Sequence, residues 1–190
     1  MGESRNQEFK RTMNWDDDNT KYKIVKAILA MSNTRNGGNI LIGIEETEEK
    51  RFLGVGMTES DFDSFNPDHV KDYLIRYADP PARIDIQKVD FTKKKFIIIN
   101  VSEFEEYPVI CKKVYDLGGK TMLENGAICI RTVAGKPQSS KVTSHVDMRE
   151  IINLSTEKRI KEISRLVDIA MSPSPEEIDE EKFEKQIGDF

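Results

Sequence analysis

Histidine and cysteine are scarce in this 190-residue sequence, with two of each. His69 and His145 stand alone, without a cysteine or a second histidine at ligand spacing, which argues against a zinc site. Cys111 and Cys129 lie in apolar segments typical of strands and have no neighbouring histidine. We therefore expect both cysteines to be reduced core residues and not nucleophiles.

The sequence also has no long apolar run. None approaches the roughly 18 residues that a membrane span requires, and the polar stretch of residues 1–8 lacks the apolar core of a signal peptide. We therefore expect no membrane segment and a cytoplasmic location. No repeat recurs at a fixed period, so the length predicts one main domain with its own core.

A positive net charge is missing too. The formal charge is −5, which argues against a protein that coats nucleic acid non-specifically. Residues 83–141 nevertheless carry eleven Lys and Arg against seven Asp and Glu, whereas residues 157–190 carry ten acids against six bases. The positive stretch supplies the candidate phosphate contacts, or alternatively ordinary solvated charges: Lys93, Lys94, Lys95, Arg131 and Lys136.

The hydrophobic pattern predicts alternating helices and strands. Helices are expected over residues 22–31, 66–77 and from 144 onward, and strands over 40–44, 52–55, 84–89, 96–101, 109–111 and 127–131. This order predicts an α/β (α+β) fold in which helices pack on a mixed, mainly antiparallel sheet. The turn after the first helix, residues 33–38, requires a left-handed conformation, so Gly37 or Gly38 is expected to have a positive φ.

The organisation expected along the chain has three parts. The main domain covers residues 1–153, and a helix whose apolar residues keep a helical period covers 154–171. After the break at Ser172-Pro173-Ser174-Pro175, residues 172–190 form an acidic linker or tail.

Four segments of the main domain together resemble one known family. Residues 30–45, AMSNTRNGGNILIGIE, are similar to the signature of the Schlafen AlbA-like domain, in which a helix ends in an Asn-Thr and glycine-pair turn before an apolar strand. The segments at 52–55 and at 126–131, the latter followed by Ser139-Ser140, resemble further family segments, and residues 2–10 resemble its opening motif. The resemblance covers about residues 1–153. It departs from the family at position 45, where Glu replaces the common Asp, and in the acidic turn 45–49.

The resemblance implies nucleic-acid binding and, as in Schlafen members, RNA cleavage at a metal site of three acids. The matching residues here are Glu3, Glu8 and Glu45, and their carboxylates would hold Mg²⁺ or Mn²⁺ through oxygen ligands. Lys10 would neutralise charge on the transition state. The alternative for Glu3 and Glu8 is that they are solvated residues at a frayed terminus.

The resulting hypothesis is a nucleic-acid-binding domain that cleaves RNA, such as tRNA or ribosomal RNA, or single-stranded DNA with a divalent metal. The alternative is a non-catalytic regulatory module whose C-terminal helix and tail engage a protein partner or a second copy in a homodimer. No Gly-x-x-x-x-Gly-Lys-Ser/Thr sequence is present, so ATP is not expected as a cofactor.

Overall fold

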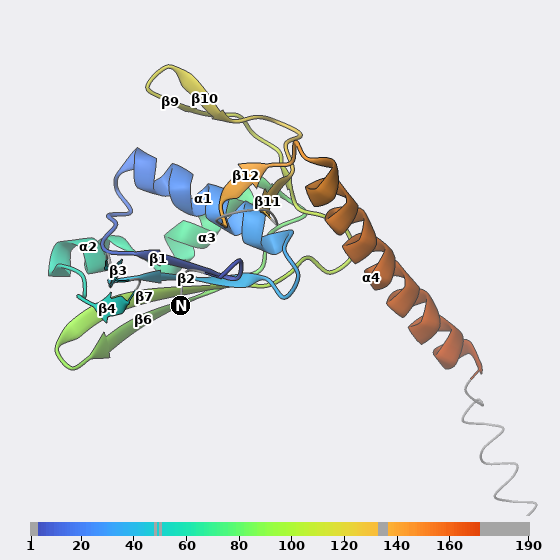
Figure 1. The fold of residues 1–190 in the computed structure, drawn as a ribbon, viewed down its shortest axis with the longest axis horizontal. Coiled ribbons are helices and arrows are strands. Elements are labelled where there is room, and N and C mark those ends of the chain that lie inside the picture. The colour runs from blue at the N-terminus through green and yellow to red at the C-terminus, as the bar shows by residue number, and fades with distance from the viewer. Residues whose placement is uncertain (1–3, 48, 50, 133–136, 172–190) are drawn as a thin grey trace, which may run out of the picture. The chain divides into compact units, whose positions relative to one another are not determined.

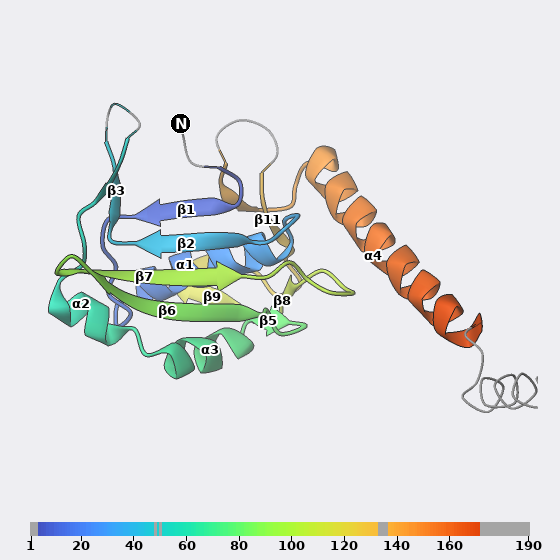
Figure 2. The same cartoon turned by 90° about the horizontal axis from the view of Figure 1, so that it is seen from below.

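The centre of the fold is a four-stranded sheet with the strand order β1-β2-β7-β6 (Figure 2). The structure is a computed structural model that describes residues 4–47, 49, 51–132 and 137–171. β1 (Gln7–Lys10) pairs parallel with β2 (Gly38–Ile42), whereas β7 (Lys94–Val101) pairs antiparallel with β2 and with β6 (Ile84–Phe91). The mixed, mainly antiparallel sheet and the α+β fold predicted from the sequence are confirmed.

Helices cover one face of this sheet. α1 (Asp18–Ser32) lies across it, and α2 (Glu59–Ser64) and α3 (Pro67–Ile75) pack nearby (Figure 1). The buried side chains alternate along the central strands and meet the apolar side of α1, as expected for a sheet with one covered face: Ile40, Ile42, Ile97 and Ile99 from the sheet, and Ile24, Ile28 and Met31 from the helix. Figure 2 looks onto the opposite face, across which no helix of the described residues runs.

Local sequence signals fix both ends of α1. Asp17 caps the first turn because its carboxylate accepts a hydrogen bond from the backbone N–H of Thr20 at 2.8 Å. At the other end the turn passes through Gly37, whose φ is +64°, so the predicted left-handed glycine is confirmed. A Cβ at Gly37 would lie 2.0 Å from the carbonyl oxygen of Val101, which leaves room for no side chain.

The strand predicted over residues 40–44 breaks at Gly43. β2 ends at Ile42, and β3 (Ile44–Glu46) leaves the sheet to pair with β4 (Phe52–Gly54). Gly43 has a φ of +103°, and its carbonyl accepts the N–H groups of Val55 and Gly56 at 2.9 and 2.8 Å. The continuous apolar pattern did not reveal this turn.

Three short strand pairs complete the β-structure. β5 (Ala78–Asp79) pairs with β8 (Ile110–Cys111), β9 (Tyr115–Leu117) with β10 (Lys120–Leu123), and β11 (Cys129–Arg131) with β12 (Ser139–Lys141). Both cysteines are buried free thiols. β1, β5, β9, β10 and β12 were not predicted, because each is at most four residues long and too short to show a strand pattern.

The predicted C-terminal helix is part of one longer helix, α4 (His145–Met171). The chain divides into two compact units, Met1–Ser155 and Thr156–Phe190. In the first unit, Ile151 and Leu154 of α4 are buried. In the second unit, α4 carries six exposed large apolar side chains: Ile160, Ile163, Leu166, Val167, Ile169 and Met171. The acidic tail lies outside the described residues. None of the helices in the described part of the chain is long and apolar enough to cross a membrane.

Candidate nucleic-acid interface

Two of the predicted site residues, Glu8 and Lys10, project from the same face of β1. Residues two apart in a strand share a face, and both side chains point to the side on which α1 packs. Glu8 is only 9% exposed, and its Oε1 lies 2.8 Å from Nζ of Lys10. Glu8 is therefore a partly desolvated carboxylate with a cation beside it.

Arg131 of β11 forms an ion pair with the second oxygen of the Glu8 carboxylate. Its Nη1 lies 3.0 Å from Oε2 of Glu8, and its guanidinium also donates to the carbonyl oxygens of Arg5 and Gln7, both at 3.1 Å. The backbone N–H of Arg131 donates to Oγ1 of Thr34 at 3.2 Å. Arg131 is only 2% exposed, so its side chain is buried next to Glu8 and does not project from the surface. Its predicted contact with nucleic acid stays a prediction.

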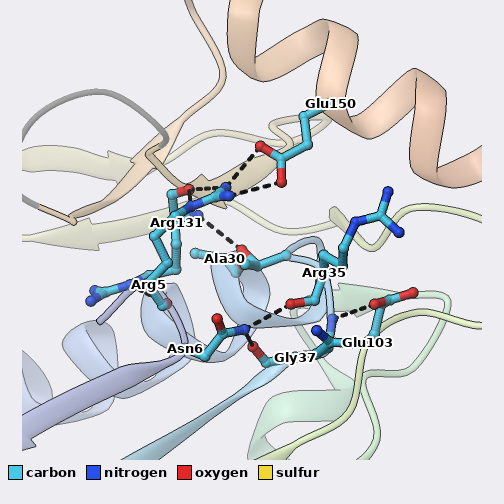
Figure 3. A network of polar contacts seen from close by, with 10 residues as sticks. Arg5, Asn6, Ala30, Arg35, Gly37, Glu103, Arg131 and Glu150 are labelled. Carbon is cyan, nitrogen blue, oxygen red and sulfur yellow. Dashed lines mark hydrogen bonds and ion pairs between the residues drawn. The ribbon is translucent and has the colours of Figure 1, made fainter. Parts of the chain in front are cut away.

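The segment that precedes β1 is held by a polar network (Figure 3). Arg5 donates to both carboxylate oxygens of Glu150, each at 2.9 Å, and to the carbonyl oxygen of Arg131 at 3.1 and 2.7 Å. The side-chain amide of Asn6 donates to the carbonyl oxygens of Arg35 and Gly37. A bidentate pair and two amide contacts fix the chain immediately before Glu8, so its orientation is set by residues distant in sequence.

These side chains line a pocket of about 400 Å³ between β1, α1 and β11. We call it the basic pocket, and its lining residues are Glu8, Lys10, Tyr22, Lys23, Lys26, Arg131, Pro137, Gln138 and Ser139. Four cations and one carboxylate share this concavity, which concentrates positive potential.

Lys23 and Lys26 were missed by the sequence reasoning. They lie three residues apart on α1 and therefore on one side of the helix, and Nζ of Lys26 lies 5.7 Å from the ring centre of Tyr22. Lysines on the polar side of an amphipathic helix are common, so their spacing alone carried no signal. Only the packing of α1 against β11 and β12 shows that they line the same pocket as Glu8.

The three predicted metal-binding acids are not assembled by the described residues. Glu45 lies in β3, where its Oε1 is 3.4 Å from Nη1 of Arg11, and Glu3 lies outside the described residues. Among the residues that the structure describes, no group of three or more His, Cys, Asp or Glu side chains could hold a metal ion. Both oxygens of Glu8 already accept from cations. The described residues alone therefore do not fit a divalent metal, and the three-acid site stays a prediction.

Three of the predicted phosphate contacts, Lys93, Lys94 and Lys95, lie at the hairpin turn from β6 to β7 and at the start of β7. Lys95 pairs with Glu59 of α2, and Nζ of Lys94 donates to the carbonyl oxygen of Gly54 at 2.6 Å. Lys93 is exposed at the turn and has no ion pair within the described part of the chain. Lys136 lies outside the described residues.

The α+β fold and the basic pocket together define a small domain with a concavity lined by four cationic side chains. The chain belongs to the Schlafen, AlbA_2 family, whose sequence profile matches residues 3–138. The resemblance seen in the sequence is thereby confirmed. A search of curated proteins found no significant match.

Two solved structures are similar to the chain. The N-terminal domain of a putative ATP-dependent DNA helicase RecG-related protein from Nitrosomonas europaea is 20% identical, with a TM-score of 0.43, over 76% of this chain and 88% of that domain. The DIP2311 protein from Corynebacterium diphtheriae is 15% identical, with a TM-score of 0.39, over 63% of this chain. The matched region spans 22% of the length of the Corynebacterium protein.

Proposed function

We propose that this domain binds nucleic acid and that the basic pocket receives a backbone phosphate. The observation that carries the proposal is the convergence of Lys10, Lys23, Lys26 and Arg131 on one concavity of about 400 Å³ in a chain whose overall charge is −5. Phosphate oxygens are the usual targets of such clustered Lys and Arg side chains. Membership of the Schlafen, AlbA_2 family supports the same class of ligand.

Lys23 and Lys26 are the side chains best suited to contact the phosphate. Lys10 and Arg131 already form ion pairs with Glu8, whereas neither Lys23 nor Lys26 makes an ion pair within the described residues. Release of counterions would therefore favour phosphate binding at these two lysines.

The experiment compares the double variant Lys23→Ala/Lys26→Ala with the parent protein. Binding of fluorescent RNA and DNA oligonucleotides is measured by anisotropy at several salt concentrations. We expect weaker binding and a salt dependence whose slope is smaller by about one unit per lost phosphate contact. The matched control is Lys71→Ala/Lys120→Ala, which removes the same charge from exposed positions outside the pocket. Equal affinities for the parent and the pocket variant would contradict the proposal.

Cleavage of the bound nucleic acid is the second candidate function. The observation that favours it is the pairing of two side chains of β1 that both line the basic pocket: Nζ of Lys10 lies 2.8 Å from Oε1 of Glu8. Mg²⁺ or Mn²⁺ would supply Lewis-acid chemistry if Glu3 or Glu45 joined Glu8 as ligands, as the family resemblance implies.

The test of cleavage uses tRNA, ribosomal RNA and single-stranded DNA with Mn²⁺, Mg²⁺ or EDTA. If the parent cleaves, Glu8→Gln is expected to reduce the rate by orders of magnitude while nucleic-acid affinity is kept or rises, since a carboxylate repels a phosphate. Circular dichroism checks that this variant is folded. A parent that cleaves none of these substrates would support the alternative, a non-catalytic module that uses α4 and the tail to engage a protein partner or a second copy.

A further inference from the structure

The tip of the β6–β7 hairpin presents an aromatic ring that the fold does not use. Phe91 is 66% exposed, although it ends a strand whose buried residue, Ile86, packs in the core. Burial of a phenylalanine side chain is ordinarily favourable by about 1.5–3 kcal/mol, so a ligand that covers this ring would gain free energy. In the described residues the only other aromatic side chain that is more than half exposed is Tyr107.

The turn that carries Phe91 has a fixed conformation. Thr92 and Lys93 have φ values of 50° and 61°, the left-handed pair typical of a tight two-residue hairpin turn. Phe91 and Lys94 are directly opposite each other across this turn. Their side chains therefore share one face of the hairpin, on the side away from α1.

The rest of the hairpin is braced by neighbouring elements. Lys88 and Lys95 lie over the ring of Phe62, at 4.2 and 4.8 Å from its centre, and they pair with Asp63 and Glu59 of α2. β4 supports the tip through the hydrogen bond from Lys94 to Gly54. Because these contacts already fix the conformation of the hairpin, it loses little conformational entropy when it binds a ligand.

The lysines at the tip that form no ion pair within the described residues indicate the chemistry of the ligand. The two inward lysines are neutralised by the acids of α2, whereas Lys93 and Lys94 make no ion pair with a described residue. The nearest acid in the hairpin, Asp90, lies opposite Lys95. An exposed ring beside two lysines offers a stacking surface for a base and attraction for its phosphates. A duplex hides the faces of its bases inside the helix, so it cannot use this ring.

We propose that Phe91 stacks on an unpaired base and that the hairpin tip makes the domain prefer single-stranded nucleic acid. This inference rests on the proposed function and assigns its substrate class. Phe91 supplies the discrimination between single strands and duplexes, and Lys93 and Lys94 beside it supply phosphate affinity at the tip.

The experiment measures affinities of the parent, Phe91→Ala and Phe91→Trp for a single-stranded oligonucleotide, its duplex and an abasic single strand. Phe91→Ala is expected to bind the single strand about 5- to 150-fold more weakly, with duplex affinity and salt slope unchanged. The abasic strand, which keeps the phosphates, is expected to bind the parent as weakly as the ordinary strand binds Phe91→Ala. Phe91→Trp is expected to keep the affinity, and its tryptophan fluorescence is expected to be quenched on binding.

Tyr107→Ala is the matched control, because it removes an exposed aromatic ring elsewhere on the domain. The inference is overturned if Phe91→Ala binds the single strand like the parent, or if it loses single-strand and duplex affinity equally. If Lys23→Ala/Lys26→Ala still weakens binding in that case, the proposed function stands. A parent that binds no nucleic acid would overturn both.

Discussion

Arg131 and Glu8 form a buried ion pair that joins two strands whose paired residues lie 123 positions apart in sequence. Nη1 of Arg131 is 3.0 Å from Oε2 of Glu8, and the two residues are 2% and 9% exposed. The same guanidinium bonds the carbonyl oxygens of Arg5 and Gln7. The pair therefore holds the N-terminal strand against β11 and at the same time orients the carboxylate at the back of the basic pocket.

Replacing Arg131 should destabilise the domain strongly. In Arg131→Met the Glu8 carboxylate loses a buried partner, which typically costs about 3–5 kcal/mol of unfolding free energy. Urea unfolding measures this loss. In a double-mutant cycle with Glu8→Gln, the two losses are expected to be less than additive, with a coupling of about 0.5–3 kcal/mol.

The exposed pair Arg11–Glu45 provides the control for this cycle. Its side chains are 70% and 37% exposed, so Arg11→Met is expected to change the unfolding free energy by no more than about 1 kcal/mol. Strict additivity of the Glu8 and Arg131 substitutions would show that their contact contributes nothing to stability.

Gly37→Ala should destabilise the fold by more than the roughly 1 kcal/mol of an ordinary glycine replacement. Two causes add: the residue has a φ of +64°, and the new Cβ would meet the carbonyl oxygen of Val101 at 2.0 Å. Gly118→Ala separates them, because Gly118 has a φ of +58° but a Cβ added there would meet no atom within 4 Å. Equal decreases of the melting temperature in the two variants would show that the close approach to Val101 contributes nothing to the loss of stability.

Cys129 should make the domain less stable at alkaline pH. Burial, with a smaller contribution from Cys111, raises the pKa of the Cys129 thiol from 9.0 to about 11. The folded state holds this proton more tightly than the unfolded state, so the stabilisation is complete below pH 9 and is lost as pH rises through about 11. Urea unfolding across this range should show a shallower decline for Cys129→Ala than for the parent. Identical pH slopes would contradict a buried, protonated thiol.

Local chemistry in the sequence determined the first helix, its turn and the central strands. Asp17, the helical period of residues 22–31 and the left-handed Gly37 act on neighbours in the chain, so their effects could be predicted without tertiary contacts. The match of residues 3–138 to the Schlafen, AlbA_2 family likewise follows from segments whose order is written in the sequence.

Tertiary structure alone decided the composition of the basic pocket and the exposure of Phe91. The four residues of β1 contain one large apolar side chain, and their pairing depends on β2, some thirty residues away. Lys23, Lys26 and Arg131 line the same pocket as Glu8 only because α1 and β11 pack together near that strand. A phenylalanine at the end of a strand is compatible with a core or an exposed position, and the tertiary structure places Phe91 at the tip of the β6–β7 hairpin with its ring in solvent. Such long-range placement depends on the packing of distant segments, which no local pattern encodes.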